Sequence, residues 1–254
     1  MTFNCIWEHN GSDTLLYSAD CIGAYTRGES LETALKKMPA EIASYLEWCG
    51  GKAPDSMDIA VAEEKVSELN IRDADSDVLF GSEIPPLTVD EYRNLKALAL
   101  KSAEDFQTMY EAVPDKNAFS VPERRTFYGL VPRSANDMYI HTRNVNEYYF
   151  AEIKVKADNL GSICECRKRG FEKLEQLSDY LLNAVAEGSY GESWTLRKVL
   201  RRFIWHDRIH AKAMHRMALK VFGAESIPNP FCFRTGINEH NINKPSSLHE
   251  YDLH

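Results

Sequence analysis

The stretch Trp205-His206-Asp207-Arg208-Ile209-His210 lies in the middle of a long run of helical periodicity. Consecutive helical residues are 100° apart, so His206 and His210 lie about 40° apart and point to the same side of the helix. Two imidazoles within an apolar stripe cost free energy unless they are hydrogen-bonded or bind a metal. The spacing therefore favours metal ligands, with satisfied core histidines as the alternative. The apolar residues on that side are Leu196, Val199, Phe203, Met214, Met217 and Val221.

The other side of the same helix is basic. His215 falls about 180° from His206, so we expect it on the solvent side with Arg208 and leave it out of any site. Aromatic interleaving on the exposed face is absent and the chain as a whole is acidic, which argues against nucleic-acid binding. We expect a solvated face, with docking of the chain's own acidic N-terminal domain as a further use. These residues are Arg197, Lys198, Arg201, Arg202, Arg208, Lys212, Arg216 and Lys220.

Charge is distributed unevenly along the 254 residues, whose net charge is −8. Residues 1–86 carry 16 Asp+Glu against 6 Lys+Arg, which leaves 22 against 24 for the remainder. This asymmetry suggests two domains, and the acidic first part argues against nucleic-acid binding there because phosphate contacts need Lys and Arg.

The cysteines and the hydropathy pattern indicate where the protein works. Six cysteines without a CxxC pair predict reduced thiols rather than a disulfide framework or a zinc ribbon. The first residues do not resemble a leader, and no stretch approaches the about 18 apolar residues of a membrane span. We therefore expect a cytoplasmic protein with no membrane contact.

Residues 1–78 are predicted to form a small domain of β-β-β-α-β order. Strands are expected at 3–8, 14–18, 21–25 and 57–62. A helix begins at the N-cap Ser30 and ends at Gly50-Gly51, and Pro39 should kink or split it. The stretch 66–86 connects this domain to the next. Its first part is acidic, and its last part, 79–86, is the linker that ends at Pro85-Pro86.

Residues 18–34, Ser-Ala-Asp-Cys-Ile-Gly-Ala-Tyr-Thr-Arg-Gly-Glu-Ser-Leu-Glu-Thr-Ala, resemble the HicB-like antitoxin fold. The family shows Pro-Asp-x-x-Gly, then Gly, then a Glu-Ala helix start; here Ala19 replaces the proline and Thr33 replaces the glutamate before Ala34. HicB antitoxins usually continue into a DNA-binding module and this chain does not, so toxin neutralisation and DNA binding are not carried over. A docking or dimerisation module is the alternative.

Residues 87–225 are predicted to form a four-helix bundle. Capping residues Thr88, Ser134 and Ser193 open the first, second and fourth helices, and the fourth ends at Gly223. The third helix is expected over about 162–186, with its core-facing residues Phe171, Leu174, Leu177, Leu181 and Val185. Residues 226–254 are predicted to form a polar C-terminal tail in which His240, His249 and His254 are solvated. The predicted fold class is therefore α+β.

His141 is the polar member of an apolar stripe on the second helix, as His206 and His210 are on the fourth. Side chains from facing helices of a bundle commonly hold a metal. Three imidazoles leave coordination positions open for water or substrate, which implies catalysis rather than a structural role. A metal held in this way lowers the pKa of its bound water toward about 7.

This constellation resembles the DinB-like superfamily, including its YfiT-like metal-dependent hydrolases and thiol-dependent transferases. The resemblance covers about residues 87–223 and is carried by Met138-Tyr139-Ile140-His141-Thr142 and by the His206-to-His210 stretch. It implies a divalent metal (nickel, zinc or manganese) at His141, His206 and His210. It also implies hydrolysis or thiol-dependent transfer on a small-molecule substrate, with a low-molecular-weight thiol as a further cofactor. Bundles of this family often pair, which makes a homodimer a candidate assembly.

Three neighbouring residues are weaker candidates. Arg202, one turn before His206, would bind an anionic substrate group or cover apolar surface with its stem. Asp207 would act as a base or hydrogen-bond a ligating imidazole, but its angle of about 100° favours a surface position. Tyr148 shares the face of His141 and is either a proton donor or part of the core.

Two other functions remain open. The string His206-Asp207-x-x-His210 is close to the His-Glu-x-x-His signature of zinc proteases, but Asp is shorter than Glu and no third downstream ligand is evident. The main alternative to an enzyme is a non-catalytic metal-binding or regulatory protein whose N-terminal domain binds a partner.

Overall fold

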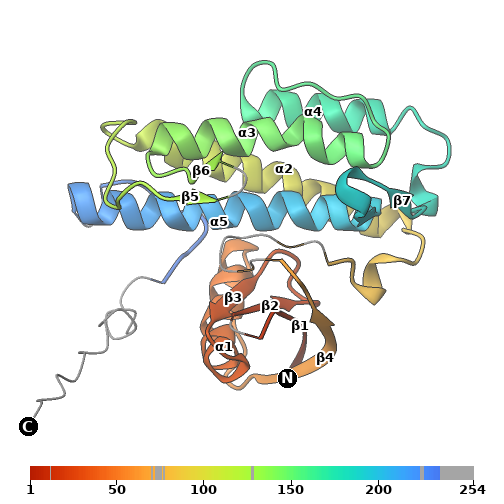
Figure 1. Ribbon diagram of the computed structural model, residues 1–254, viewed down its shortest axis with the longest axis horizontal. Coiled ribbons are helices and arrows are strands. Elements are labelled where there is room, and N and C mark those ends of the chain that lie inside the picture. The colour runs from red at the N-terminus through yellow and green to blue at the C-terminus, as the bar shows by residue number, and fades with distance from the viewer. Residues whose placement is uncertain are drawn as a thin grey trace, which may run out of the picture.

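The computed structural model describes residues 1–11, 13–69, 71, 76, 78–126, 129–223 and 226–234. Within them the chain is a mixture of strands and helices, so the predicted α+β class is confirmed at that level. The long helix α5 (Leu196–Phe222) lies between three other helices on one side and a four-stranded sheet with its own helix on the other (Figure 1). None of the described helices has the length and apolar character needed to cross a membrane.

The N-terminal part is a sheet with strand order β3-β2-β1-β4, in which β1 and β4 run parallel and the other neighbours antiparallel. Every residue of β2 is buried because both faces of the sheet are covered. Leu16 belongs to the core cluster that includes Met38 of the helix, and Leu15 to the cluster that includes Trp205 of α5. The elements are β1 (Thr2–His9), β2 (Thr14–Ser18), β3 (Tyr25–Gly28), α1 (Leu31–Trp48) and β4 (Asp58–Val66).

Two predictions for this part need correction. The third strand begins at Tyr25 instead of residue 21, because residues 21–24 form a turn in which Ala24 N donates to Cys21 O at 2.9 Å. Helix α1 continues through Pro39, so the predicted split does not occur. Met38 and Ile42 beside the proline are fully buried, and this packing offsets the hydrogen bond that proline cannot donate.

The described residues of the C-terminal part include four α-helices, among which α5 packs against α2 and α3, and α4 packs against the same two. Thr88 and Ser134 cap α2 and α3 as predicted, each accepting a hydrogen bond from a backbone N–H of the first turn. The remaining helices are α2 (Val89–Ala112), α3 (Ala135–Glu152) and α4 (Ile163–Leu174). The short elements are η2 (Gly81–Glu83), the hairpin β5 (Arg125–Thr126) and β6 (Gly129–Leu130), η3 (Tyr180–Leu182), η4 (Ser189–Gly191), and the hairpin β7 (Ala186–Glu187) and β8 (Ser193–Trp194).

The predicted third helix is too long. Helix α4 ends at Leu174, and Leu177 and Val185, expected in the core, are 42% and 52% exposed. The chain turns at Asn183, whose amide donates to the carbonyls of Glu83 and Pro85 and accepts from the N–H of Arg197. These long-range hydrogen bonds outweigh the helical periodicity of the segment.

The predicted cap of the last helix is also displaced. The N-cap is Thr195, whose side chain accepts from Lys198 N. Ser193 instead pairs with Glu187 in the β7–β8 hairpin. The helix ends at Gly223, as expected.

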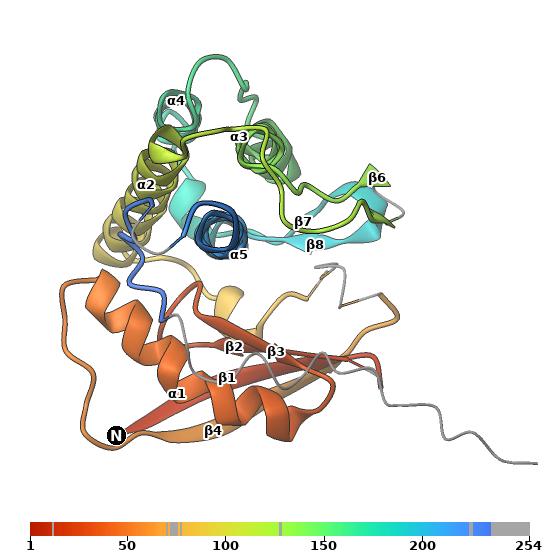
Figure 2. The same cartoon turned by 90° about the vertical axis from the view of Figure 1, so that its left-hand side faces the viewer.

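Most of the basic face of α5 is covered, and among its residues only Arg216 and Lys220 are exposed as expected. Figure 2, which looks along α5, shows that the N-terminal sheet lies directly beneath it. Arg208 and Lys212 each bind Glu41 of α1 at 2.8 Å, and Arg201 binds Glu83. The acidic N-terminal part therefore docks on this face.

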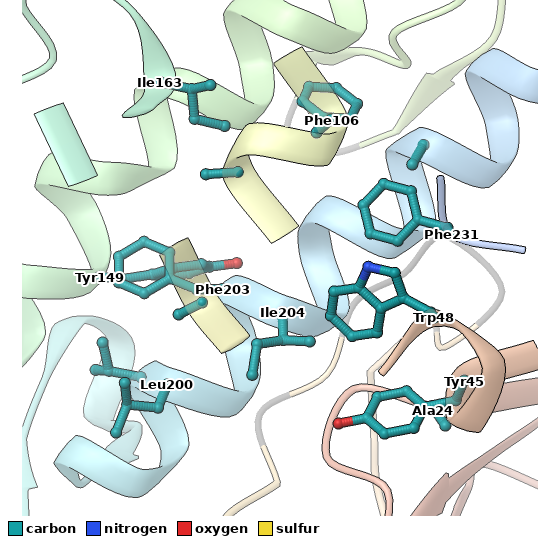
Figure 3. Packing of buried hydrophobic residues seen from close by; sticks show 14 of the residues in the cluster. Ala24, Tyr45, Trp48, Phe106, Tyr149, Ile163, Leu200, Phe203, Ile204 and Phe231 are labelled. Atoms are coloured by element: carbon teal, nitrogen blue, oxygen red, sulfur yellow. The ribbon is translucent and has the colours of Figure 1, made fainter. Parts of the chain in front are cut away.

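The start of the predicted polar tail is buried as well. Phe231 is fully buried and Phe233 is 5% exposed. Figure 3 shows Phe231 beside Trp48, and the two ring centroids are 5.3 Å apart. His215, expected in solvent, is 5% exposed, and the ring of Phe233 lies 6.1 Å from its own. His240, His249 and His254 lie outside the described residues.

Candidate metal centre

The structure brings together the three predicted ligands. His141 comes from α3 and His206 and His210 come from α5, and one ligand nitrogen from each lies within 4.8 Å of the others. The Nε2 atoms of His141 and His206 are 3.1 Å apart. The ring centroids of His206 and His210 are 4.5 Å apart, and that of His141 is 5.0 and 4.8 Å from them. The group could hold a metal ion.

The helices place these side chains through their apolar faces. Phe203 and Met214, on the same stripe of α5 as His206, are completely buried and so fix which side of the helix faces α3. His206 is 7% exposed, His210 is half-buried and His141 is exposed. The group is thus closed on the side of α5 and reaches solvent at His141.

Burial keeps the imidazoles neutral. His141 is exposed as a whole residue, but desolvation of its ring lowers its pKa; burial and the neighbouring histidines lower the pKa values of His206 and His210 well below the ordinary value. Positive charges lower them further: Arg202 and Arg167 act on His206, and Arg27 acts on His210. A neutral imidazole has the free lone pair that a metal requires.

The donor set fits a divalent transition metal. Imidazole suits zinc, nickel, copper and iron. Nitrogens bound to one zinc ion at about 2.0–2.1 Å lie about 3 Å from each other, which is the separation of the Nε2 atoms of His141 and His206. Nδ1 of His206 is buried and has no hydrogen-bond partner among the described residues. Its ring is held instead by the ring of Tyr149, which meets it edge-on at 6.0 Å and 89°.

Asp207 is not a surface residue. It is fully buried and binds Arg167 of α4 through both oxygens, at 2.9 and 3.1 Å, and the hydroxyl of Ser102 of α2. At about 100° from His206 it faces α2 and α4, which the helical angle alone could not reveal. Its carboxylate is therefore bound to the neighbouring helices.

Arg202 and Tyr148, the two other candidates, have different surroundings. Arg202 donates to Ser76 O at 2.7 Å, and its guanidinium carbon is 4.7 Å from the ring centroid of Trp205 and 5.5 Å from that of Tyr149. Tyr148 is half-buried with its ring 5.5 Å from that of Tyr149, and burial raises its pKa.

Sequence reasoning missed Tyr149 and Arg27. Tyr149 lies in the run Tyr148-Tyr149-Phe150, where periodicity alone does not single out the ring that reaches the histidines. Arg27 belongs to the other part of the chain, so no local pattern links it to them. No family model, curated protein or solved structure matches this chain.

Proposed function

We propose that the chain is a divalent-metal-dependent enzyme of DinB-like type, which acts on a small molecule by hydrolysis or by thiol-dependent transfer. The observation that carries the proposal is the group of three neutral imidazoles from two facing helices, closed toward α5 and exposed at His141. Within the same proposal, helices α2 to α5 form a DinB-like four-helix bundle and residues 1–78 a HicB-like domain. Zinc, nickel and manganese are the candidate metals.

His141, His206 and His210 would hold the ion. When bound, it supplies Lewis acidity and lowers the pKa of a coordinated water or thiol. Tyr149 orients His206 through its edge-on ring contact. Tyr148 is the candidate proton donor: a tyrosine is protonated near neutral pH, and burial raises its pKa further. Asp207 acts as a positioning residue that fixes α5 against α2 and α4, in place of the catalytic base considered above.

A second candidate is a non-catalytic, regulatory metal protein. It is favoured by the contact of the N-terminal sheet with the helix turn before His206, where the Tyr25 and Trp205 rings meet at 6.1 Å. In that case metal binding at the histidines would alter how the N-terminal part docks on α5.

Metal content tests the proposal. Protein purified without chelator is analysed by elemental mass spectrometry as wild type, His206→Ala and His9→Ala. His9 is the control because it lies on β1, where it binds Glu64 at 3.0 Å, outside the three-histidine group. We expect one zinc, nickel or manganese per chain in wild type and in His9→Ala, and loss of most of it in His206→Ala.

The outcome also separates the two candidates. Loaded protein is next assayed for hydrolysis of small esters and amides and for thiol transfer. A wild-type protein that contains no metal and does not bind added zinc, nickel or manganese would overturn both candidate functions. Loaded protein without any such activity, in which metal changes the fluorescence of Trp205, would favour the regulatory protein.

A further inference from the structure

We propose that Arg202 is a positioning residue of the metal centre, which connects the N-terminal sheet to the ring of His206 through Tyr149. The inference rests on the proposed function, because it requires the three histidines to hold a metal. It adds a means by which the N-terminal part of the chain sets the geometry of the metal site. It also gives Arg202 a role other than binding a substrate anion.

The connection begins at the N-terminal sheet, to which Ser76 is bound by two hydrogen bonds. The hydroxyl of Ser76 donates to Glu8 of β1 at 2.7 Å and accepts from the hydroxyl of Tyr17 of β2 at 2.8 Å. All three side chains are buried. The carbonyl oxygen of Ser76 accepts a hydrogen bond from Nη1 of Arg202 at 2.7 Å. The guanidinium of Arg202 is therefore anchored, through Ser76, to two strands of the sheet.

The same guanidinium lies among aromatic rings from both sides of α5. Its central carbon is 4.7 Å from the ring centroid of Trp205, whose neighbours in the core belong to the N-terminal part. It is 5.5 Å from the ring centroid of Tyr149, which lies on α3, and 5.8 Å from that of Trp194. A planar guanidinium can stack on aromatic rings while it donates hydrogen bonds within its own plane. Arg202 thus fixes Tyr149 relative to the sheet.

Tyr149 carries the connection to the metal ligand. It is buried, and its ring meets that of His206 edge-on at 6.0 Å and 89°. Phe203 packs on the same tyrosine, with the two ring centroids 5.3 Å apart (Figure 3). A ligating histidine is usually oriented by a hydrogen bond to its second ring nitrogen. Nδ1 of His206 has no such partner in the described part of the chain, so the direction of this ring depends on Tyr149.

The surroundings of Arg202 suit a positioning role better than contact with a substrate. Its Nε is buried, and its Nη1 is used by the carbonyl of Ser76. Arg201, the preceding residue, is buried too, but it lies about 100° further round α5. It binds Glu83 and the carbonyl of Val78, so it ties α5 to the N-terminal part at a place away from Tyr149. Arg201 is therefore a matched control for Arg202.

The test compares wild type with Arg202→Met, Arg202→Lys and Arg201→Met. Circular dichroism establishes that each protein is folded before it is titrated with Co²⁺. The visible absorption of bound cobalt reports both its affinity and the geometry of its coordination. Arg201→Met measures what the loss of a buried arginine of α5 does to the metal site when the contact of Arg202 with Tyr149 is kept.

We expect Arg202→Met to bind cobalt about tenfold more weakly than wild type and with altered visible bands, because residues that orient a metal-bound histidine typically contribute about 10–100-fold in metal affinity. Arg202→Lys should fall between, since lysine can still donate to the carbonyl of Ser76 but does not stack as a guanidinium does. Arg201→Met should keep the affinity and the bands of wild type while its stability falls.

Two further proteins, Tyr149→Leu and the double variant Arg202→Met/Tyr149→Leu, test whether Arg202 acts through Tyr149. The double variant should bind cobalt no more weakly than Tyr149→Leu alone. A double variant whose loss equals the product of the two single losses would overturn the connection.

The remaining outcomes are also decisive. Folded Arg202→Met with wild-type affinity and bands overturns the inference and leaves the metal site standing. An equal loss of affinity in Arg201→Met overturns it as well, because any loosening of the N-terminal part would then have the same effect. If Arg202→Met does not fold, the comparison of Arg202→Lys with wild type decides in the same way. Wild type that binds no cobalt overturns the proposed function and this inference with it.

Discussion

Asp207 and His206 are adjacent in the chain and meet different neighbours. His206 faces His141 on α3, whereas Asp207 is enclosed by Arg167 of α4 and Ser102 of α2. A fully buried carboxylate and guanidinium compensate each other only while both are present. The pair therefore fixes the rotation of α5 about its axis, and with it the direction in which His206 and His210 point.

Removing one partner of this pair should be costly. Arg167→Met leaves the Asp207 carboxylate buried without its counter-ion, and we expect the free energy of unfolding to fall by about 3–5 kcal/mol. The double variant Arg167→Met/Asp207→Leu should recover most of that loss because no unpaired charge remains. Urea denaturation followed by circular dichroism measures both. The single variant Asp207→Leu is measured alongside, and a double variant whose loss equals the sum of the two single losses would mean that the two side chains do not depend on each other.

At the scale of single residues, the sequence predicted the direction in which a side chain leaves its helix but not which residues it contacts. The four-residue spacing of His206 and His210 places both imidazoles on one side of any helix, and the structure agrees. The same geometry also places Asp207 and His215 outside that stripe. Both are nevertheless buried, because α2 and α4 cover Asp207 and Phe233 packs near His215.

Helix α5 is the central element of the fold, since it is covered on opposite sides by the other helices and by the N-terminal part. Glu41 of α1 binds both Arg208 and Lys212 of α5. Burial of Glu41 raises its pKa, but Lys212 and Arg208 outweigh this effect and lower the pKa to about 2 from 4.5. The carboxylate is thus charged in the folded protein at any pH above that value.

This shift makes the attachment of α1 to α5 depend on pH. Because the folded-state pKa is lower than the unfolded-state pKa, the stabilisation is complete above pH 4.5 and is lost as the pH falls toward 2. Glu41→Gln should therefore reduce the free energy of unfolding at pH 7 by about 3 kcal/mol, and the difference from wild type should shrink between pH 4.5 and 2.

Glu32→Gln is the matched control for Glu41→Gln, because Glu32 is an exposed glutamate of the same helix. Urea denaturation at a series of pH values gives both differences. An effect of Glu41→Gln that stays constant from pH 7 to pH 2 would show that the ion pairs do not hold α1 to α5.

Element boundaries were predictable where local side chains determine them. The capping sequences at Thr88 and Ser134 open helices at the expected positions because each cap acts within one turn. The end of α4 was not predictable, because Asn183 is held by hydrogen bonds to residues about a hundred positions away.

As a whole, the molecule has a main core that both parts of the chain share. The largest cluster of buried residues runs from Phe3 and Met38 through Phe203 to Phe231. The mixed α+β composition and the basic face of α5 could be predicted from the sequence. The ion-pair partners of that face could not, because they depend on how two separately patterned parts meet.

A single close contact between the two parts should affect the stability of the entire molecule. Gly23→Ala places a Cβ atom on Ile204 at a residue whose φ is +98°, and we expect the free energy of unfolding to fall by about 2–4 kcal/mol. Gly50→Ala is the control, since φ there is +78° and a Cβ atom would meet nothing within 4 Å. It should cost only the backbone strain of about 1–2 kcal/mol.

Tryptophan fluorescence and far-ultraviolet circular dichroism during urea unfolding measure this effect in both parts. With a shared core, the two signals should change at the same urea concentration in Gly23→Ala as in wild type, at a lower midpoint. Two separate transitions in the wild-type protein would contradict the shared core.

The return of the chain to α1 after α5 also governs the order of events during synthesis. The hydroxyl of Ser44 donates to the carbonyl of Phe231, 187 residues further along, and Arg234 binds Glu47. Ribosomes add about 5–20 residues per second, so α1 waits roughly 10–40 seconds for the segment that covers its Trp48. During that interval the nascent N-terminal part carries an uncovered apolar surface, which makes it a binding site for chaperones until residues 231–234 have emerged.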